Sequence, residues 1–382
     1  MLHALFFIAT VGGFGIFQAV HAVTPLEPIG LQGRVLTDTD HWLALVGDSG
    51  ITGAASATDI NATVENLWGH VSQIHRPIAE LRQMPKVVDP LTRVLYSKNE
   101  FLNAGWWLGP WLLNVGAKLA LTLDTHEHSF GYRVGRALGV RSEDIVLVGQ
   151  DGVRIDTIAQ QLERVFEMQT STLPPLILLS YTANDMCDVR VLTDPLDVWV
   201  ERFRGALEKT WLDAEPFLRA HARGTKIMVL SPLNLDNVIL NTSILKQKIL
   251  VEGQGQITCE EVRTATPQFS PGPWLILRIL NLMCPSVTST IRDQGDRVQR
   301  LQDLQRGFIA AWRQEIKSLN SKYKDRGIEW VFLDEVFNLQ FTTGDVGHDC
   351  FHPSAAGHAK IADLILRKLK MPPPGETSRN DH

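Results

Sequence analysis

Ser49 is the first residue of this sequence whose type and surroundings suit chemistry. It follows an apolar run at 42–46 and the pair Gly47 and Asp48. A short apolar run that ends at glycine predicts a buried strand, and open α/β sheets carry their chemistry at the carboxyl ends of strands. A serine on such a turn presents its hydroxyl, which predicts a nucleophile. The same residues also fit an ordinary strand-to-helix turn or a helix N-cap.

Three further sets of polar or small residues fall at predicted strand ends or in the last loop. Gly152 follows a second strand, where Gly149 is an alternative, and Asn184 follows a third. Asp349 and His352 stand before the last predicted helix. Each has a structural alternative, because an Asn or Asp can cap a helix and a histidine before proline can be a surface residue. Their order along the chain is therefore more informative than any one of them.

The elements that would position these residues alternate between strand and helix. Such alternation predicts a parallel sheet covered by helices on both faces, a three-layer α/β/α sandwich. The strand order 2-1-3-4-5 is the flavodoxin-like choice for five strands. We expect strands at 42–46, 144–148, 176–180, 226–230 and 330–333, and helices at 61–84, 129–138, 155–168, 196–222, 297–323 and 356–369.

Taken together, these motifs resemble the SGNH, or GDSL-type, family of esterases and lipases. The resemblance rests on Gly-Asp-Ser at 47–49, a glycine after the second strand, Asn-Asp-Met-Cys at 184–187 and the Asp-x-x-His segment at 349–358. It covers 41–369 in the family's order. The wording of the last two segments is most similar to the phospholipase B branch, and acyloxyacyl hydrolases are a more distant likeness. The resemblance implies the SGNH hydrolase fold, with helical insertions here.

The resemblance also implies a role for each residue. Ser49 is the expected nucleophile, His352 the base that takes its proton, and Asp349 the carboxylate that holds the other ring nitrogen. Attack on an ester creates an oxyanion, which needs donors already in place. The family's donors correspond to the backbone N–H groups of Ser49 and Gly152 and the side-chain amide of Asn184. The family implies no metal and no cofactor for this reaction.

Two departures from the family pattern lie beside these residues. Gly50 intervenes where the family places an aliphatic residue, and Ala183 stands where a glycine usually precedes Asn184. Neither change removes a catalytic group. Gly-Asp-Ser-Gly also occurs in trypsin-like proteases, but those are β-barrels with the histidine early and the serine late, the reverse of the order here.

Composition limits the class of protein further. The chain has 382 residues, 44% hydrophobic and 21% charged, with a net charge of −5, which suits a globular domain with a sizeable core. Lys and Arg are scattered, so we expect no nucleic-acid partner. We predict one hydrolase domain over 23–371, with insertions at about 87–128 and 234–290, and a disordered tail at 372–382.

The beginning of the chain and its cysteines suggest export. An apolar segment at 5–20 with small residues after it predicts a secretory signal over 1–22, and an uncleaved membrane anchor is the alternative. No Lys or Arg precedes the apolar segment. An even number of cysteines in an exported chain predicts two disulfides with three possible pairings. The four are Cys187, Cys259, Cys284 and Cys350.

The expected substrate class rests on an almost wholly apolar stretch at 101–123. It contains Trp106, Trp107 and Trp111, and Pro110 interrupts it. A buried or lid-like insertion therefore fits better than a membrane span. We expect a secreted esterase that acts on lipids, phospholipid or lysophospholipid first, with peripheral contact to membranes. The alternatives are a carbohydrate O-acetyl esterase and a catalytically silent member that binds lipid or protein.

Overall fold

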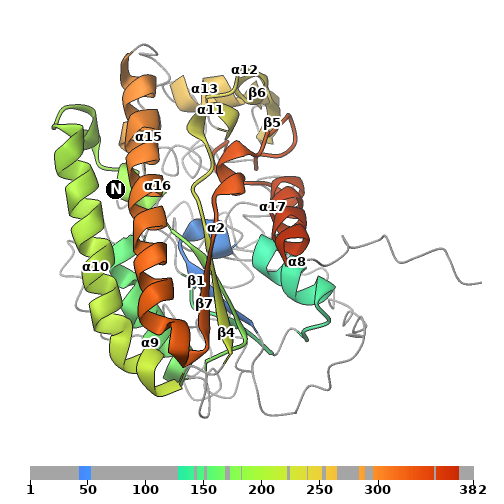
Figure 1. Ribbon diagram of the computed structural model, residues 1–382. Coiled ribbons are helices and arrows are strands. Elements are labelled where there is room, and N and C mark those ends of the chain that lie inside the picture. The colour runs from blue at the N-terminus through green and yellow to red at the C-terminus, as the bar shows by residue number, and fades with distance from the viewer. Residues whose placement is uncertain are drawn as a thin grey trace, which may run out of the picture.

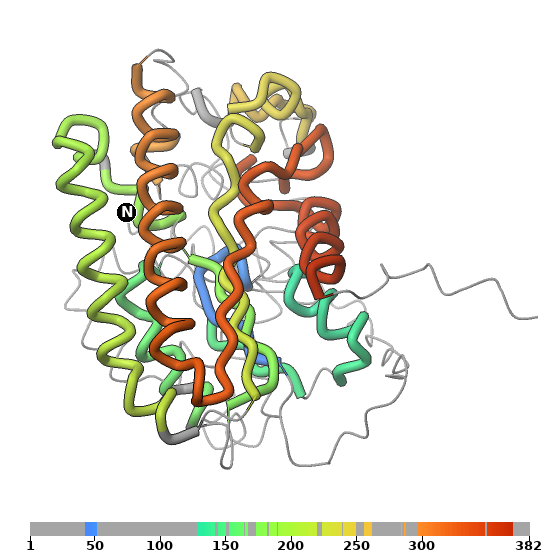
Figure 2. The backbone as a smooth tube through the Cα atoms, viewed as in Figure 1, coloured from blue at the N-terminus to red at the C-terminus, as the bar shows by residue number. Residues whose placement is uncertain are grey.

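The structure is a computed structural model, shown as a ribbon in Figure 1 and as a backbone tube in Figure 2. The predicted segments at 1–22, 61–84 and 372–382 and most of the insertion at 87–128 lie outside the residues that it describes. The described residues are 43–52, 128–141, 144–149, 153–167, 173–181, 183–221, 224–238, 240–251, 255–264, 284–288, 296–347 and 350–369.

A five-stranded parallel sheet forms the centre of the fold. Its strands follow the order β2-β1-β3-β4-β7, and every neighbouring pair is parallel. This is the flavodoxin-like order predicted from the sequence, since β7 is the fifth strand to join the sheet. The strands are β1 (Leu43–Gly47), β2 (Ile145–Leu147), β3 (Leu176–Ser180), β4 (Thr225–Leu230) and β7 (Ile328–Leu333).

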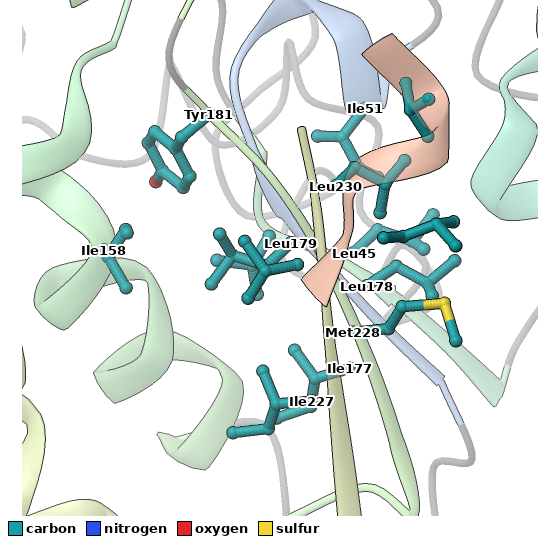
Figure 3. Close-up of a cluster of buried hydrophobic side chains, with 14 of the residues drawn as sticks. Leu45, Ile51, Ile158, Ile177, Leu178, Leu179, Tyr181, Ile227, Met228 and Leu230 are labelled. Atoms are coloured by element: carbon teal, nitrogen blue, oxygen red, sulfur yellow. The ribbon is translucent and has the colours of Figure 1, made fainter. Parts of the chain in front are cut away.

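The strands are apolar because both faces of the sheet are buried. Figure 3 shows Leu178 and Met228 on one side of the strands and Ile177, Leu179 and Ile227 on the other. All five are at most 1% exposed. Side chains alternate between the faces of a strand, so a sheet covered on both faces needs an uninterrupted apolar run.

Helices cover the two faces and complete three layers (Figure 1). One face carries α9 (Ile158–Glu167), α10 (Leu196–His221) and α16 (Asp296–Tyr323). Helix α10 contacts both of the others, while α9 contacts β1 and α16 contacts β7. The other face carries α8 (Phe130–Ala137) and α17 (Ala355–Lys368), which pack together. The fold is thus the α/β/α sandwich of the SGNH hydrolases.

Aromatic side chains fill the layer beneath α10 and α16. The rings of Phe203 and Phe308 stack with centroids 4.0 Å apart, and Trp211 meets Trp330 of β7 edge-on at 4.6 Å. Offset stacking and edge-to-face contacts are the favoured geometries of aromatic pairs. The two long helices are therefore held to each other and to the edge strand by the same cluster.

The element boundaries differ little from the predicted ones. The segment predicted as one helix over 155–168 begins with a 3-10 turn, η3 (Ile155–Thr157), before α9. Helix α8 is capped by Ser129, whose hydroxyl accepts from the backbone N–H of Tyr132, and Gly139 follows the helix with φ +74°. None of the helices among the described residues is both long and apolar enough to cross a membrane.

The described part of the insertion at 234–290 contains a small antiparallel hairpin that the sequence analysis did not predict. Strand β5 (Lys248–Val251) pairs with β6 (Gly255–Thr258) there. The short helices of this region are α11 (Leu235–Val238), α12 (Thr242–Leu245), α13 (Cys259–Thr264) and α15 (Pro285–Thr288).

Replacing two helical glycines with alanine should change the free energy of unfolding in opposite directions. A Cβ on Gly357 in α17 would lie 2.2 Å from the carbonyl oxygen of Asp345, whereas a Cβ on Gly205 in α10 would meet nothing within 4 Å among the described residues. We expect Gly357→Ala to lower the free energy of unfolding by about 1–3 kcal/mol through overpacking. Gly205→Ala should raise it by about 0.5–1 kcal/mol, because alanine favours the helix. Urea unfolding of both variants measures the difference, and equal midpoints would contradict this packing of α17.

Candidate active site

The turn that carries Ser49 is tightly determined by its backbone. Gly47 has φ +155°, and a Cβ there would lie 2.2 Å from the carbonyl oxygen of Ser180. The next peptide N–H, that of Asp48, donates to the same oxygen at 3.0 Å. The carboxylate of Asp48 then accepts from the N–H of Gly50 at 2.9 Å, which closes an Asx turn. Only glycine fits at 47, and Asp48 shapes the turn.

Ser49 begins a short helix, α2 (Ser49–Thr52), and lies against the loop before α17. Its Oγ is 2.8 Å from Nε2 of His352, although the two residues are 303 positions apart. The Ser49 side chain is largely shielded, with the residue 7% exposed. A hydroxyl within hydrogen-bond distance of an imidazole nitrogen is the geometry that lets the ring accept the hydroxyl proton.

Asn184 lies where β3 ends, at the start of the 3-10 turn η4 (Asn184–Met186). Its Nδ2 donates to the carbonyl oxygen of Val153 at 3.0 Å. This bond orients the amide and ties the segment after β3 to the loop after β2. The carboxyl ends of β1 and β3 are level, because Gly47 pairs with Ser180, so Asn184 follows β3 at the same edge as Ser49.

The other two predicted site residues, Asp349 and Gly152, lie outside the described residues. The structure does describe Gly149, the alternative to Gly152. The N–H of Gly149 donates to the carbonyl oxygen of Leu45 at 3.1 Å, alongside that of Val148 at 2.9 Å. The Gly149 amide thus bonds to β1.

Asp185 has a structural role that the sequence did not indicate. Its carboxyl oxygens accept from the backbone N–H of Ile155 at 3.2 and 3.4 Å, which joins η4 to η3. Burial raises the pKa of Asp185 to about 8, against the opposing effect of this hydrogen bond. Residues 184 and 185 therefore each bind one end of the segment 153–155.

Gln161 is a second residue that reasoning from the sequence missed. It is buried on α9, and its side-chain amide bonds to both backbone groups of Gly47. The only local signal for this role is the position of a glutamine on the apolar face of the predicted helix at 155–168. The sequence does not indicate that Gly47 is its hydrogen-bond partner.

Two disulfides fasten the insertion to the loops that carry the site. The pairs are Cys187–Cys284 and Cys259–Cys350. All four cysteines are paired, which confirms the prediction of two disulfides and selects one of the three pairings. Cys187 lies three residues after Asn184, and Cys350 two residues before His352.

The buried side-chain amide of Gln247 also supports the loop that leads to His352. Oε1 of Gln247 accepts from the N–H of Gly344 at 3.0 Å, and its Nε2 donates to the carbonyl oxygen of Val346 at 2.9 Å. Gln247 and Cys259 both belong to the insertion, on either side of the β5–β6 hairpin. The insertion therefore holds the segment that leads to His352 at two separate points.

His358 on α17 has a structural role. It is fully buried, and its Nδ1 accepts from the N–H of Phe130 at 3.3 Å, which joins α17 to α8. Burial lowers the pKa of His358 to about 3, so it stays neutral near pH 7. Among the described residues, no three His, Cys, Asp or Glu side chains gather as metal ligands would.

Comparison with known families identifies the class of this protein. The sequence profile of the family described as GDSL-like Lipase/Acylhydrolase matches residues 45–365. The chain belongs to this family, and it is an ester hydrolase by that membership. A search of curated proteins finds no match to this sequence.

Solved structures with a similar trace include two enzymes. One is an extracellular lipase from Streptomyces rimosus, with 10% identity and a TM-score of 0.39 over 86% of this chain and 99% of that one. The other is a gut microbial diltiazem-metabolizing enzyme, with 11% identity and a TM-score of 0.34 over 88% of this chain. This chain spans 48% of that second protein. Neither likeness bears on substrate or mechanism.

The disulfide at Cys350 should affect both stability and turnover. We expect the double variant Cys259→Ser, Cys350→Ser to lose about 2–4 kcal/mol of unfolding free energy. It should also turn over at least about 10-fold more slowly, because the segment before His352 loses one of its two anchors. Thermal unfolding and kcat on a soluble ester measure the two effects.

Thiol titration of denatured, unreduced wild-type protein is the control and should find no reactive thiol. An unchanged kcat in the folded double variant would show that Gln247 and its neighbours hold the loop without the disulfide.

Proposed function

We propose that this protein is an exported serine esterase that hydrolyses acyl ester bonds of lipids, in the manner of phospholipase B. The observation that carries the catalytic part is the 2.8 Å contact between Ser49 Oγ and His352 Nε2 at the carboxyl edge of a parallel sheet. The location rests on two disulfides, which persist in oxidising compartments.

In the proposed reaction, Nε2 of His352 takes the proton from Ser49 as Oγ attacks the ester carbonyl. Asp349, three residues earlier in the sequence, accepts a hydrogen bond from the N–H of the other ring nitrogen and stabilises the imidazolium. The imidazolium then protonates the leaving alcohol, which departs and leaves an acyl-serine. Water, activated by the same histidine, releases the fatty acid and regenerates Ser49.

The oxyanion of each tetrahedral intermediate would accept from three donors. Two are the backbone N–H groups of Ser49 and Gly152, and the third is Nδ2 of Asn184. One proton of that amide is already directed at Val153, so the amide is oriented before substrate binds. Donors that need no reorganisation stabilise the charge where it develops, which is why they act mainly on kcat.

The lipid part of the proposal rests on the sequence. An acyl chain needs an apolar surface, and each buried methylene contributes about 0.8 kcal/mol. The segment at 101–123 would supply such a surface, with tryptophans that suit a membrane interface. A polar sugar ester would instead call for polar side chains along a groove. The resemblance at 184–187 and 349–358 to the phospholipase B branch points the same way.

Two substitutions test the catalytic roles. Ser49→Ala should abolish labelling by a fluorophosphonate and lower kcat by about 10⁴- to 10⁶-fold, because no nucleophile remains. Asn184→Ala should still be labelled, but its kcat should fall about 10²- to 10³-fold with little change in KM. Steady-state kinetics on a soluble ester give both values.

Circular dichroism of both variants controls for folding. A folded Ser49→Ala protein that keeps a tenth of wild-type activity would overturn the assignment of the nucleophile. A change in KM alone for Asn184→Ala would make that residue a substrate contact and not an oxyanion donor. Failure of the wild-type protein to react with the probe would favour the catalytically silent alternative.

Replacement of Trp106 and Trp107 tests the proposed substrate class. If the segment at 101–123 binds acyl chains, wild-type activity should rise with acyl length up to about eight carbons or more. The variant with both residues replaced by Ala should keep its rate on an acetyl ester and lose activity on long-chain esters. An equal loss on both substrates, or a preference of the wild-type protein for acetylated sugar, would contradict the lipid assignment.

A further inference from the structure

Strand β1 extends beyond its neighbour β2, so on that side the described residues provide no strand partner for Gly47. The carbonyl oxygen of Leu45 accepts from Val148 and Gly149, so the backbone groups of Leu45 face β2. Alternate residues of a strand direct their N–H and C=O groups to the same side, so Gly47 faces that side too. The paired part of β2, however, ends at Leu147, which is level with Leu45.

The side chain of Gln161 occupies the place of the missing strand. Its Oε1 accepts from the N–H of Gly47 at 2.8 Å, and its Nε2 donates to the carbonyl oxygen of Gly47 at 3.1 Å. A primary amide presents a donor and an acceptor in one plane, as a peptide group does. Gln161 is 2% exposed, so water does not compete for either bond.

The chain after β2 is thereby free to take another path. After Gly149 it leads to Gly152, and then to Val153, whose carbonyl oxygen accepts from Asn184. A longer β2 would satisfy Gly47 by itself but would continue along β1 instead of bringing Val153 to Asn184. The glutamine side chain supplies the hydrogen bonds of a strand residue without the strand.

We propose that Gln161 is a positioning residue for the nucleophile, which acts by fixing the peptide two residues before Ser49. The proposal rests on the proposed function of Ser49. On the β3 side the turn is held by the bond from Asp48 to Ser180, and on the β2 side it is held by Gln161. Loss of the amide leaves one side unsupported, and a displacement of Ser49 by about 1 Å can lower a rate by about 100-fold.

Gln305 on α16 provides a matched control. It is also buried, with 0% exposure, and its Nε2 donates to the carbonyl oxygen of Leu233 at 2.8 Å. Its Oε1 accepts from the N–H of Leu235 at 3.3 Å. The same kind of amide therefore holds a loop after β4 that contains none of the proposed catalytic residues.

The first experiment compares Gln161→Leu with Gln305→Leu. Both leave two buried backbone groups unpaired, so both should lower the melting temperature. Only Gln161→Leu should slow fluorophosphonate labelling and lower kcat, by about 10- to 100-fold, with KM within about threefold of wild type. Gln305→Leu should keep kcat within about twofold when measured on folded protein.

The second experiment replaces each glutamine with glutamate, which has nearly the same shape. In Gln161→Glu, the protonated carboxyl group can donate to Gly47 and accept from it, but the ionised carboxylate has no proton to donate. The kcat of Gln161→Glu relative to wild type should therefore be close to one at low pH and fall as pH rises. The same ratio for Gln305→Glu should stay flat, because ionisation there affects only stability.

The outcomes distinguish a failure of the proposed function from a failure of the positioning role of Gln161. If wild-type protein does not react with the fluorophosphonate, the proposed function fails. If wild type reacts and Gln161→Leu reacts equally fast, only the positioning role fails. Should Gln161→Leu not fold, the pH dependence of Gln161→Glu decides the question, and a flat ratio for both glutamate variants would overturn the proposal.

Discussion

The structure depends on one contact between distant parts of the chain, the hydrogen bond between Ser49 and His352. It joins residues 303 positions apart across 2.8 Å, a distance at which proton transfer is direct. Neither residue lies within a long regular element. Ser49 begins a four-residue helix, and His352 lies in the loop before α17. The surrounding structure must therefore hold two loop ends in place.

The two ends are held by different means. The turn at Ser49 is fastened to the sheet by backbone geometry, through Gly47 and the carbonyl oxygen of Ser180. The loop at His352 lies after β7, and it is fastened from outside the sheet by Gln247 and the Cys259–Cys350 disulfide. A longer irregular segment has more conformational freedom to lose, so it needs more tertiary contacts to become rigid.

Three buried glutamines perform the same physical task in this fold. Gln161, Gln247 and Gln305 each accept from one backbone N–H and donate to one backbone carbonyl, either at a strand end or in a loop. Buried backbone groups must be paired, and beyond the last residue of a ladder the chain itself offers no partner. A primary amide from a neighbouring helix or loop supplies both missing bonds, so these backbone groups are paired although no adjacent strand reaches them.

The sequence alone determined the order of the sheet and the strand ends after which Ser49 and Asn184 stand. Apolar runs, the glycines or polar residues that end them, and helix caps are local signals, and they decide where β1 and β3 end. The family resemblance led to the expected contact between Ser49 and His352, but the pairing of Cys259 with Cys350 and the partner of Gln161 were decided only by the tertiary structure. A glutamine in a helix has the same local pattern whether it faces water or a strand end, and four cysteines permit three pairings. Which groups meet depends on how the layers pack, because packing brings together residues that no local pattern connects.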